Sequence, residues 1–330
     1  MSQKIASMRL GQTGPQVFPI GLGCMGMSGM YGPADEAESL ATIRHAIERG
    51  VTLLDTGDFY GMGHNEMLVR RGIEGLRDKV QISVKFGALR GPDGTWLGAD
   101  TRPAAVKTFA AYSLRRLGVD VIDIYRPARL DPNVPIEETV GAIADLVKAG
   151  YVRHIGLSEV GAETIRRAAK VQPIVDLQIE YSLASRGPEA SIFPALRELG
   201  ISATLYGVFS RGLLTGSKPT GKGDFRQFLP RFAGENGAKN VAIVDELRRF
   251  GADRGLTPAQ LALAWVRAKE PTLLPVVGAR TRAQLDDALG ALAKPLSPSD
   301  VAAVEARVPP AAVVGTRYAP EQMKHLDSER

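Results

Sequence analysis

The sequence repeats one unit, a short apolar run followed by a helix-like stretch, and this repeat limits the folds open to the chain. Eight apolar runs, starting at Pro19–Met25, alternate with segments whose apolar residues recur at helical spacing. The runs are continuously apolar, as expected for parallel strands that are covered on both faces. The pattern predicts a (β/α)8 TIM barrel of the α/β class, formed by residues 1–330 as a single domain. A doubly wound open sheet is the alternative, but GLGCMG after the first run does not match G-x-G-x-x-G.

Two segments lie outside this repeat. Residues from Met8 to Gly14, with the following VFPIGLG, predict an N-terminal β-hairpin. From Leu296 we expect a C-terminal extension with one helix, SPSDVAAVEARV, and a tail that crosses one mouth of the barrel. The stretch from Leu214 to Lys239 shows no periodicity and is predicted to be an irregular loop. Helices are expected over Asp35–Arg49, Glu66–Leu76, Arg102–Leu117, Ile136–Ala149, Ala162–Ala169, Glu189–Leu199 and Thr257–Lys269.

Composition excludes several classes of function. The net charge is +5, and basic residues are interspersed with acidic ones, so a nucleic-acid partner is not expected. The single cysteine, Cys24, and four dispersed histidines predict neither a disulfide framework nor a metal site. No apolar leader and no membrane span are apparent in the sequence, so we expect a cytoplasmic protein that does not bind membranes. The oligomeric state has no signature in the sequence.

Two neighbouring strands of the predicted barrel end in ionisable side chains. In VTLLDTGDFYG the strand ends at Asp55, and the following turn presents Tyr60, while the next strand, ISVKF, ends near Lys85. The carboxyl ends of barrel strands meet at one mouth, where a cation would lower the pKa of a phenol from about 10. Asp55 would then keep Lys85 charged and oriented, and Tyr60 would transfer a proton. Two alternatives remain open: a structural ion pair beside a packing tyrosine, or a Schiff-base aldolase that uses Lys85.

Several separated motifs resemble the aldo-keto reductase superfamily, from about Met8 to Arg307. They are DTGDFYGMGHNE, ISVKFG, IDIYRPARLDPNVPIEETVGAI, VRHIGLSE, LQIEYS, SRGLLTG and PVVGARTRAQL. The resemblance implies a barrel that binds NADP(H) and reduces aldehydes or ketones to alcohols by hydride transfer. It further implies Tyr60 as general acid, supported by Lys85 and Asp55, and a small-molecule carbonyl compound as substrate.

One catalytic residue of that superfamily is absent. Its pattern places a histidine before Arg-x-Asp-Pro, where this chain has Ala128 in RPARLDP. The histidine donates a hydrogen bond to the substrate carbonyl, which alanine cannot do. We therefore expect an altered substrate preference, with Arg129, Trp96 or water as a substitute donor; the alternative is a cofactor-binding sensor with little turnover. The expected substrate pocket consists of Met27, Tyr60, Trp96, Ala128 and Arg129.

The resemblance also assigns residues to the cofactor. Ser158 and Gln178 match the positions that hold the carboxamide, with Glu159 in place of the usual asparagine, and Tyr206 matches the aromatic residue that stacks on the nicotinamide. Arg280, together with Lys218, is expected to contact the 2′-phosphate, although both residues also suit a solvated surface. The full predicted set is Gly23, Cys24, Met25, Asp55, Ser158, Glu159, Gln178, Tyr206, Gly207, Val208, Ser210, Lys218, Gly278, Arg280, Gln284 and Asp287.

Overall fold

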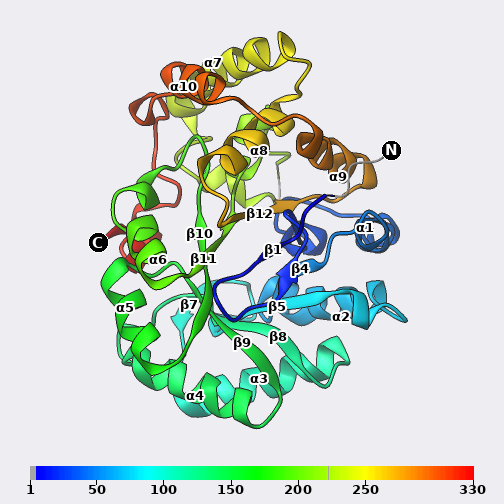
Figure 1. Ribbon diagram of the computed structural model, residues 1–330, viewed down its shortest axis with the longest axis vertical. Coiled ribbons are helices and arrows are strands. Elements are labelled where there is room, and N and C mark those ends of the chain that lie inside the picture. The colour runs from blue at the N-terminus through cyan, green and yellow to red at the C-terminus, as the bar shows by residue number, and fades with distance from the viewer. Residues whose placement is uncertain (1–4, 222) are drawn as a thin grey trace.

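The computed structural model describes residues 5–221 and 223–330, and its centre is a closed barrel of eight parallel strands (Figure 1). Neighbouring strands follow one another along the chain, and β12 pairs with β3 to close the barrel. The predicted (β/α)8 fold is therefore confirmed. The barrel strands are β3 (Gly21–Gly23), β4 (Leu53–Gly57), β5 (Gln81–Phe86), β8 (Ile122–Pro127), β9 (Val152–Ser158), β10 (Ile174–Glu180), β11 (Ser202–Tyr206) and β12 (Leu273–Gly278).

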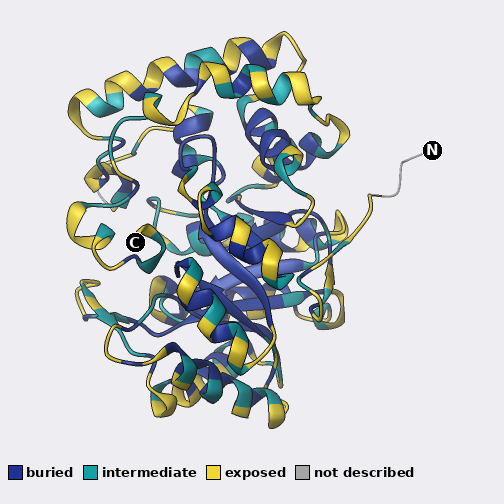
Figure 2. Ribbon diagram, turned by 60° about the vertical axis from the view of Figure 1, so that its left-hand side comes forward, coloured by how far each residue is buried: buried dark blue, intermediate teal, exposed yellow. Residues whose placement is uncertain are grey.

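Helices surround the barrel, with buried inner faces and exposed outer faces (Figure 2). Side chains cap several of them: the Asp35 carboxylate accepts from the backbone N–H of Glu38, and Thr257 and Gln260 form a capping box. Among the described residues, no helix has the length and apolar character needed to cross a membrane. The helices are α1 (Glu36–Glu48), α2 (His64–Gly72), α3 (Pro103–Leu117), α4 (Ile136–Lys148), α5 (Ala162–Val171), α6 (Ile192–Leu199), α7 (Gly234–Ala252), α8 (Pro258–Lys269), α9 (Arg282–Leu289), α10 (Pro298–Arg307) and α11 (Pro320–Met323).

The predicted N-terminal hairpin is present and packs on the barrel strands. Its strands β1 (Met8–Arg9) and β2 (Gln16–Val17) are antiparallel. Leu10 and Val17 are buried in a small apolar cluster with residues of four barrel strands, including Leu53. Because that cluster lies inside the barrel near the strand starts, the hairpin leaves the opposite mouth free for a site.

Three elements differ from the sequence-based expectation, and one of them is the short helix α11 (Pro320–Met323) in the tail, where no helix is predicted. A second hairpin, β6 (Ala88–Arg90) and β7 (Trp96–Ala99), follows β5 and was not predicted. Helix α7 begins at Gly234, inside the stretch predicted to be irregular. Its first turn, GENG, contains two glycines and an asparagine, which are poor helix formers, so packing and not propensity determines its start.

Candidate active site

A cavity of about 290 Å³ opens at the carboxyl ends of the barrel strands. Its walls include strand ends, the β6–β7 hairpin and the C-terminal tail, and the tail's position at this mouth agrees with the sequence prediction. The structure thus brings much of the predicted site into one space. The predicted residues that line the cavity are Gly23, Met25, Asp55, Tyr60, Lys85, Trp96, Ala128, Arg129, Ser158, Gln178, Tyr206, Gly207 and Gly278.

A buried polar group of the cavity is centred on Asp55. Lys85 Nζ donates to Asp55 Oδ2 at 2.5 Å, and both side chains are buried. Ser83 Oγ and Gln178 Nε2 donate to Asp55 Oδ1 at 3.0 and 2.8 Å. Lys85 Nζ also lies 5.2 Å from the centre of the Tyr60 ring. The carboxylate therefore fixes the ammonium group beside the tyrosine.

A turn after β4 holds Tyr60 at the cavity wall. Gly61 and Met62 both have a left-handed backbone conformation, with φ of 55° and 53°. This conformation favours glycine, which the chain has at position 61 but not at position 62. The Asn65 side chain anchors this turn, because its amide donates to the Cys24 carbonyl at 2.8 Å and its oxygen accepts from Thr56 at 2.7 Å. The strained turn and its anchor keep the phenol in one place.

Burial determines the protonation of the tyrosine. It raises the pKa of Tyr60 well above the usual value, and the negative charge of Asp55 raises it further. Burial lowers the pKa of Lys85, whereas Asp55 raises it. The sequence predicts that Lys85 lowers the pKa of Tyr60, but in the structure burial outweighs the opposing charge, which is that of Arg129. Tyr60 therefore holds its proton at neutral pH, which is the form that a general acid requires.

Two buried polar atoms of the cavity wall have no partner among the described residues. They are Ser158 Oγ and Gln178 Oε1. The hydrogen bond from Gln178 Nε2 to Asp55 fixes the amide, so that its oxygen remains available as an acceptor. Unsatisfied buried polar groups are costly and call for a ligand. A hydroxyl and an amide oxygen together fit a carboxamide, which presents both donors and an acceptor.

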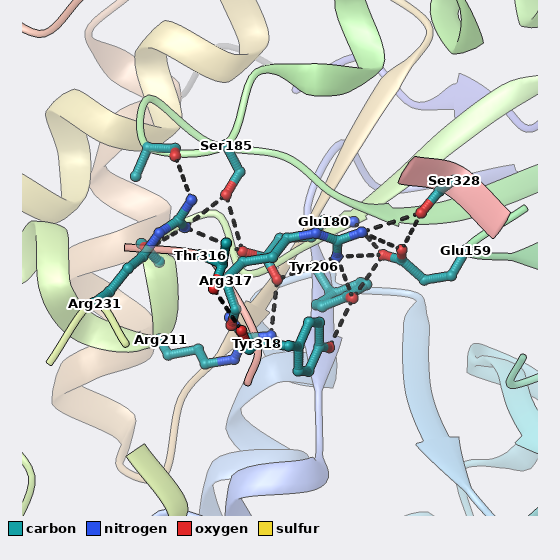
Figure 3. Close-up of polar contacts among 12 residues, drawn as sticks. Glu159, Glu180, Ser185, Tyr206, Arg211, Arg231, Thr316, Arg317, Tyr318 and Ser328 are labelled. Atoms are coloured by element: carbon teal, nitrogen blue, oxygen red, sulfur yellow. Dashed lines mark hydrogen bonds and ion pairs between the residues drawn. The ribbon is translucent and has the colours of Figure 1, made fainter. Parts of the chain in front are cut away.

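Glu159 does not line the cavity, and its carboxylate is fully engaged (Figure 3). Arg317 donates to its two oxygens at 2.9 and 2.5 Å, and Tyr206 and Ser328 each donate at 2.6 Å. Burial opposes ionisation, but Arg317 overcomes it and lowers the pKa of Glu159 to about 2. The sequence predicts Glu159 as a cofactor residue in the asparagine position. In the structure its carboxylate accepts hydrogen bonds from Tyr206 and from the tail residues Arg317 and Ser328.

The C-terminal tail forms one wall of the cavity through Tyr318 (Figure 3). The Tyr318 hydroxyl lies 2.9 Å from that of Tyr206 and accepts from Arg129 Nη2 at 3.2 Å. The Arg211 guanidinium lies 4.4 Å from the centre of the Tyr318 ring. The tail therefore touches both the residue expected to stack on a cofactor and the residue next to Ala128.

The remaining predicted residues lie outside the cavity wall. Arg280 donates to the backbone carbonyls of Tyr31 and Pro33 at 3.2 Å, and its own N–H donates to Gln284. Asp287 faces α8, where it accepts from Thr257 at 2.9 Å. Cys24, Met27 and Val208 are buried in the core, Ser210 accepts from Arg231, and Lys218 is exposed.

Several residues of the cavity wall were not predicted as site residues from the sequence. Arg90 and Phe59 line the wall, as do Tyr318 and His325 of the tail. Arg211 lies within the motif SRGLLTG, which we recognised without assigning a role to its arginine. Arg90 belongs to the β6–β7 hairpin, which was not predicted. Arg90 could have been placed at the cavity only if that hairpin had been predicted.

Known proteins resemble this chain along most of its length. The model of the Aldo/keto reductase family matches residues 19–308. The aldo-keto reductase yakc of Schizosaccharomyces pombe, whose name specifies NADP(+), is 38% identical over 310 residues, or 91% of either chain.

Solved structures are similar as well. Glycerol dehydrogenase AKR11B4 from Gluconobacter oxydans has a TM-score of 0.83 and 26% identity, with 94% of this chain and 97% of that one covered. An aldo/keto reductase from Klebsiella pneumoniae, in complex with NADP and acetate, has a TM-score of 0.73 and 26% identity, with 94% and 99% covered.

Proposed function

The chain belongs to the aldo/keto reductase family, and from this premise we propose that it reduces aldehydes or ketones to alcohols with NADPH. The observation that carries the proposal is the position of Tyr60 in the cavity beside the buried Asp55–Lys85 pair. The NADP in the name of the yeast relative, and in the complex of the Klebsiella protein, supports the cofactor.

Bound NADPH supplies the hydride. Ser158 Oγ and Gln178 Oε1 are the atoms that would hold its carboxamide, because both are buried in the cavity wall without another partner among the described residues. The Tyr206 ring offers a stacking face, and its hydroxyl is tied to Glu159. Arg280 is the residue that we assign to the 2′-phosphate.

Tyr60 donates its proton to the carbonyl oxygen. Lys85 lies over the tyrosine ring, so its charge stabilises the negative charge that develops on the phenol. Asp55 keeps Lys85 charged and in position. Ala128 supplies no hydrogen bond to the substrate, which leaves orientation to Tyr60 and to the other walls of the cavity.

The test is a screen of aldehydes and ketones with the Tyr60→Phe variant. Removal of the acid is expected to lower kcat/KM by at least about 100-fold, as for other general acids, while quenching of NADPH fluorescence is retained. Tyr31→Phe, which removes another phenol of the same cavity, is the matched control and should change kcat/KM only a few-fold.

Three results would contradict the proposal. Unchanged turnover in Tyr60→Phe would refute its role as acid. Single-turnover oxidation of NADPH by the wild-type protein no faster than in buffer would favour a sensor. Borohydride trapping of a carbonyl compound on Lys85 without nucleotide would favour an aldolase.

A further inference from the structure

The charges on the cavity wall do not balance. Among the described residues, Asp55 is the only carboxylate that lines the cavity, against Lys85, Arg90, Arg129 and Arg211. Asp55 pairs with Lys85 at 2.5 Å, and Arg211 pairs with Glu180 at 2.8 Å. Within the described part of the chain, no carboxylate forms an ion pair with Arg90 or Arg129, so these two guanidinium groups carry the surplus positive charge.

Both groups are partly buried and are only partly satisfied. Arg129 donates to its neighbour's carbonyl, that of Ala128, at 2.6 Å and to the Tyr318 hydroxyl at 3.2 Å. Arg90 donates to the Gly94 carbonyl at 3.3 Å. Burial lowers the pKa of Arg90, and the nearby charge of Arg129 lowers it further. Each guanidinium has five N–H donors, so most of them remain free for a ligand.

The neighbouring ion-pair cluster (Figure 3) forms no ion pair with Arg129, although the negative charge of Glu159 favours the charged form of this guanidinium. That cluster contains three carboxylates, Glu159, Glu180 and Glu329, and three guanidinium groups, Arg211, Arg231 and Arg317. Its charges already cancel. Arg129 and Arg90 stand outside it on the cavity side.

Their place in the barrel puts them away from the residues assigned to the cofactor phosphate. Arg129 follows β8, and Arg90 lies on the hairpin that follows β5, the strand next to β8. Arg280 follows β12, which lies diametrically opposite β8 in the order of the barrel. The Arg90 guanidinium lies 5.3 Å from the Trp96 ring and 6.0 Å from the Phe59 ring, so apolar surface adjoins it.

On the basis of the proposed function, we propose that Arg90 and Arg129 bind a carboxylate group of the substrate. The preferred substrates are thus carbonyl compounds that carry a carboxylate, with their apolar part against Phe59 and Trp96. The planar forks of the guanidinium groups match a carboxylate, and the ligand charge offsets the surplus positive charge of the wall. The residue pair would thereby orient the carbonyl that Ala128 does not contact.

Matched substrates test this inference with NADPH as cofactor. Benzaldehyde is compared with its 3-carboxy and 4-carboxy derivatives, and the selectivity ratio is kcat/KM for a carboxylated substrate over that for benzaldehyde. The wild-type ratio is expected to exceed about 10 for at least one derivative. Arg90→Met and Arg129→Met should each lower that ratio about tenfold or more, whereas Arg44→Met, on the exposed face of α1, should keep it.

A binding measurement keeps the inference separate from the proposed function. Calorimetry with benzoate and the NADP(+)-loaded protein should show binding that weakens at least tenfold in either variant, while benzyl alcohol should not discriminate among the proteins. A wild-type ratio near 1 with active benzaldehyde reduction would overturn the inference alone. Absence of any reduction, with benzoate binding intact, would overturn the proposed function alone. Weaker NADPH binding in both variants at an unchanged ratio would assign the arginines to the cofactor and overturn the inference.

Discussion

At the scale of single residues, Asp58 lies close to the candidate acid Tyr60. Its surroundings disfavour the charged form of its carboxyl group. It lies two positions before Tyr60, its Oδ2 accepts from the Gly87 N–H at 3.2 Å, and its buried Oδ1 has no partner among the described residues. Burial raises the pKa of Asp58 to about 7. In the unfolded chain the same group titrates near 3.8, so folding takes up a proton between these two values.

This difference predicts how stability depends on pH. Because the folded state binds the proton more tightly, the Asp58 contribution makes the free energy of unfolding fall as pH rises from about 4 to about 7, and it stays constant above. Asp58→Asn removes that charge while keeping the shape, and should stabilise the protein by about 1 to 3 kcal/mol at pH 8 and hardly at pH 4. Urea unfolding at both pH values measures the effect. The exposed Asp120→Asn is the control, and an equal gain at both pH values in Asp58→Asn would contradict the assignment.

At the scale of elements, the C-terminal tail is held on the barrel through buried charges. Arg317 of the tail pairs with Glu159 at the end of β9, and Asp327 accepts from the Gly161 N–H at 2.7 Å. A buried charge without its partner costs several kcal/mol, whereas loss of both partners costs less than the sum of the single losses. The same pair positions Tyr206, so the tail and the cofactor side of the cavity are physically connected.

A double-mutant cycle tests this connection. Arg317→Met and Glu159→Gln should each lower the free energy of unfolding by about 3 kcal/mol, and the coupling energy between them should be about 2 kcal/mol. The matched cycle at the more exposed pair Arg166–Glu198 should give a coupling below about 1 kcal/mol. Equal coupling in the two cycles, measured by urea unfolding, would show that the buried pair does not hold the tail.

The strands and helices also show which parts of the structure can be predicted from the sequence. The barrel and its strand ends were predictable because each strand is a local apolar run, and Asp55 and Lys85 belong to adjacent runs. The partner of Glu159 was not predictable, because Arg317 is separated from it by more than 150 residues and no local pattern links them. Arg129 was expected in the substrate pocket, but Arg90 was missed, because the turn signal GPDG at residues 91–94 was not interpreted as the turn of a hairpin.

At the scale of the whole molecule, arginine residues lie on two opposite sides of the barrel mouth. Arg90 and Arg129 lie on the side of β5 and β8, while Arg280 follows β12 on the opposite side. The tail crosses between these sides at Tyr206. A ligand that spans the mouth would therefore stabilise the folded barrel as a unit, because it contacts strands from both halves of the chain.

Thermal shifts with the two nicotinamide cofactors measure that stabilisation. A ligand at 100 times its Kd stabilises the folded state by about 2.7 kcal/mol, which is expected to raise Tm by several degrees. Arg280→Ala should remove about 1.5 to 3 kcal/mol of NADPH binding, because a guanidinium bound to a phosphate forms a charge-assisted hydrogen bond, while the shift with NADH stays close to wild type. Arg282→Ala, an exposed arginine paired with Glu38, is the control and should retain both shifts. Equal losses with NADPH and NADH in Arg280→Ala would instead mean that Arg280 acts through its hydrogen bonds to the backbone at Tyr31 and Pro33.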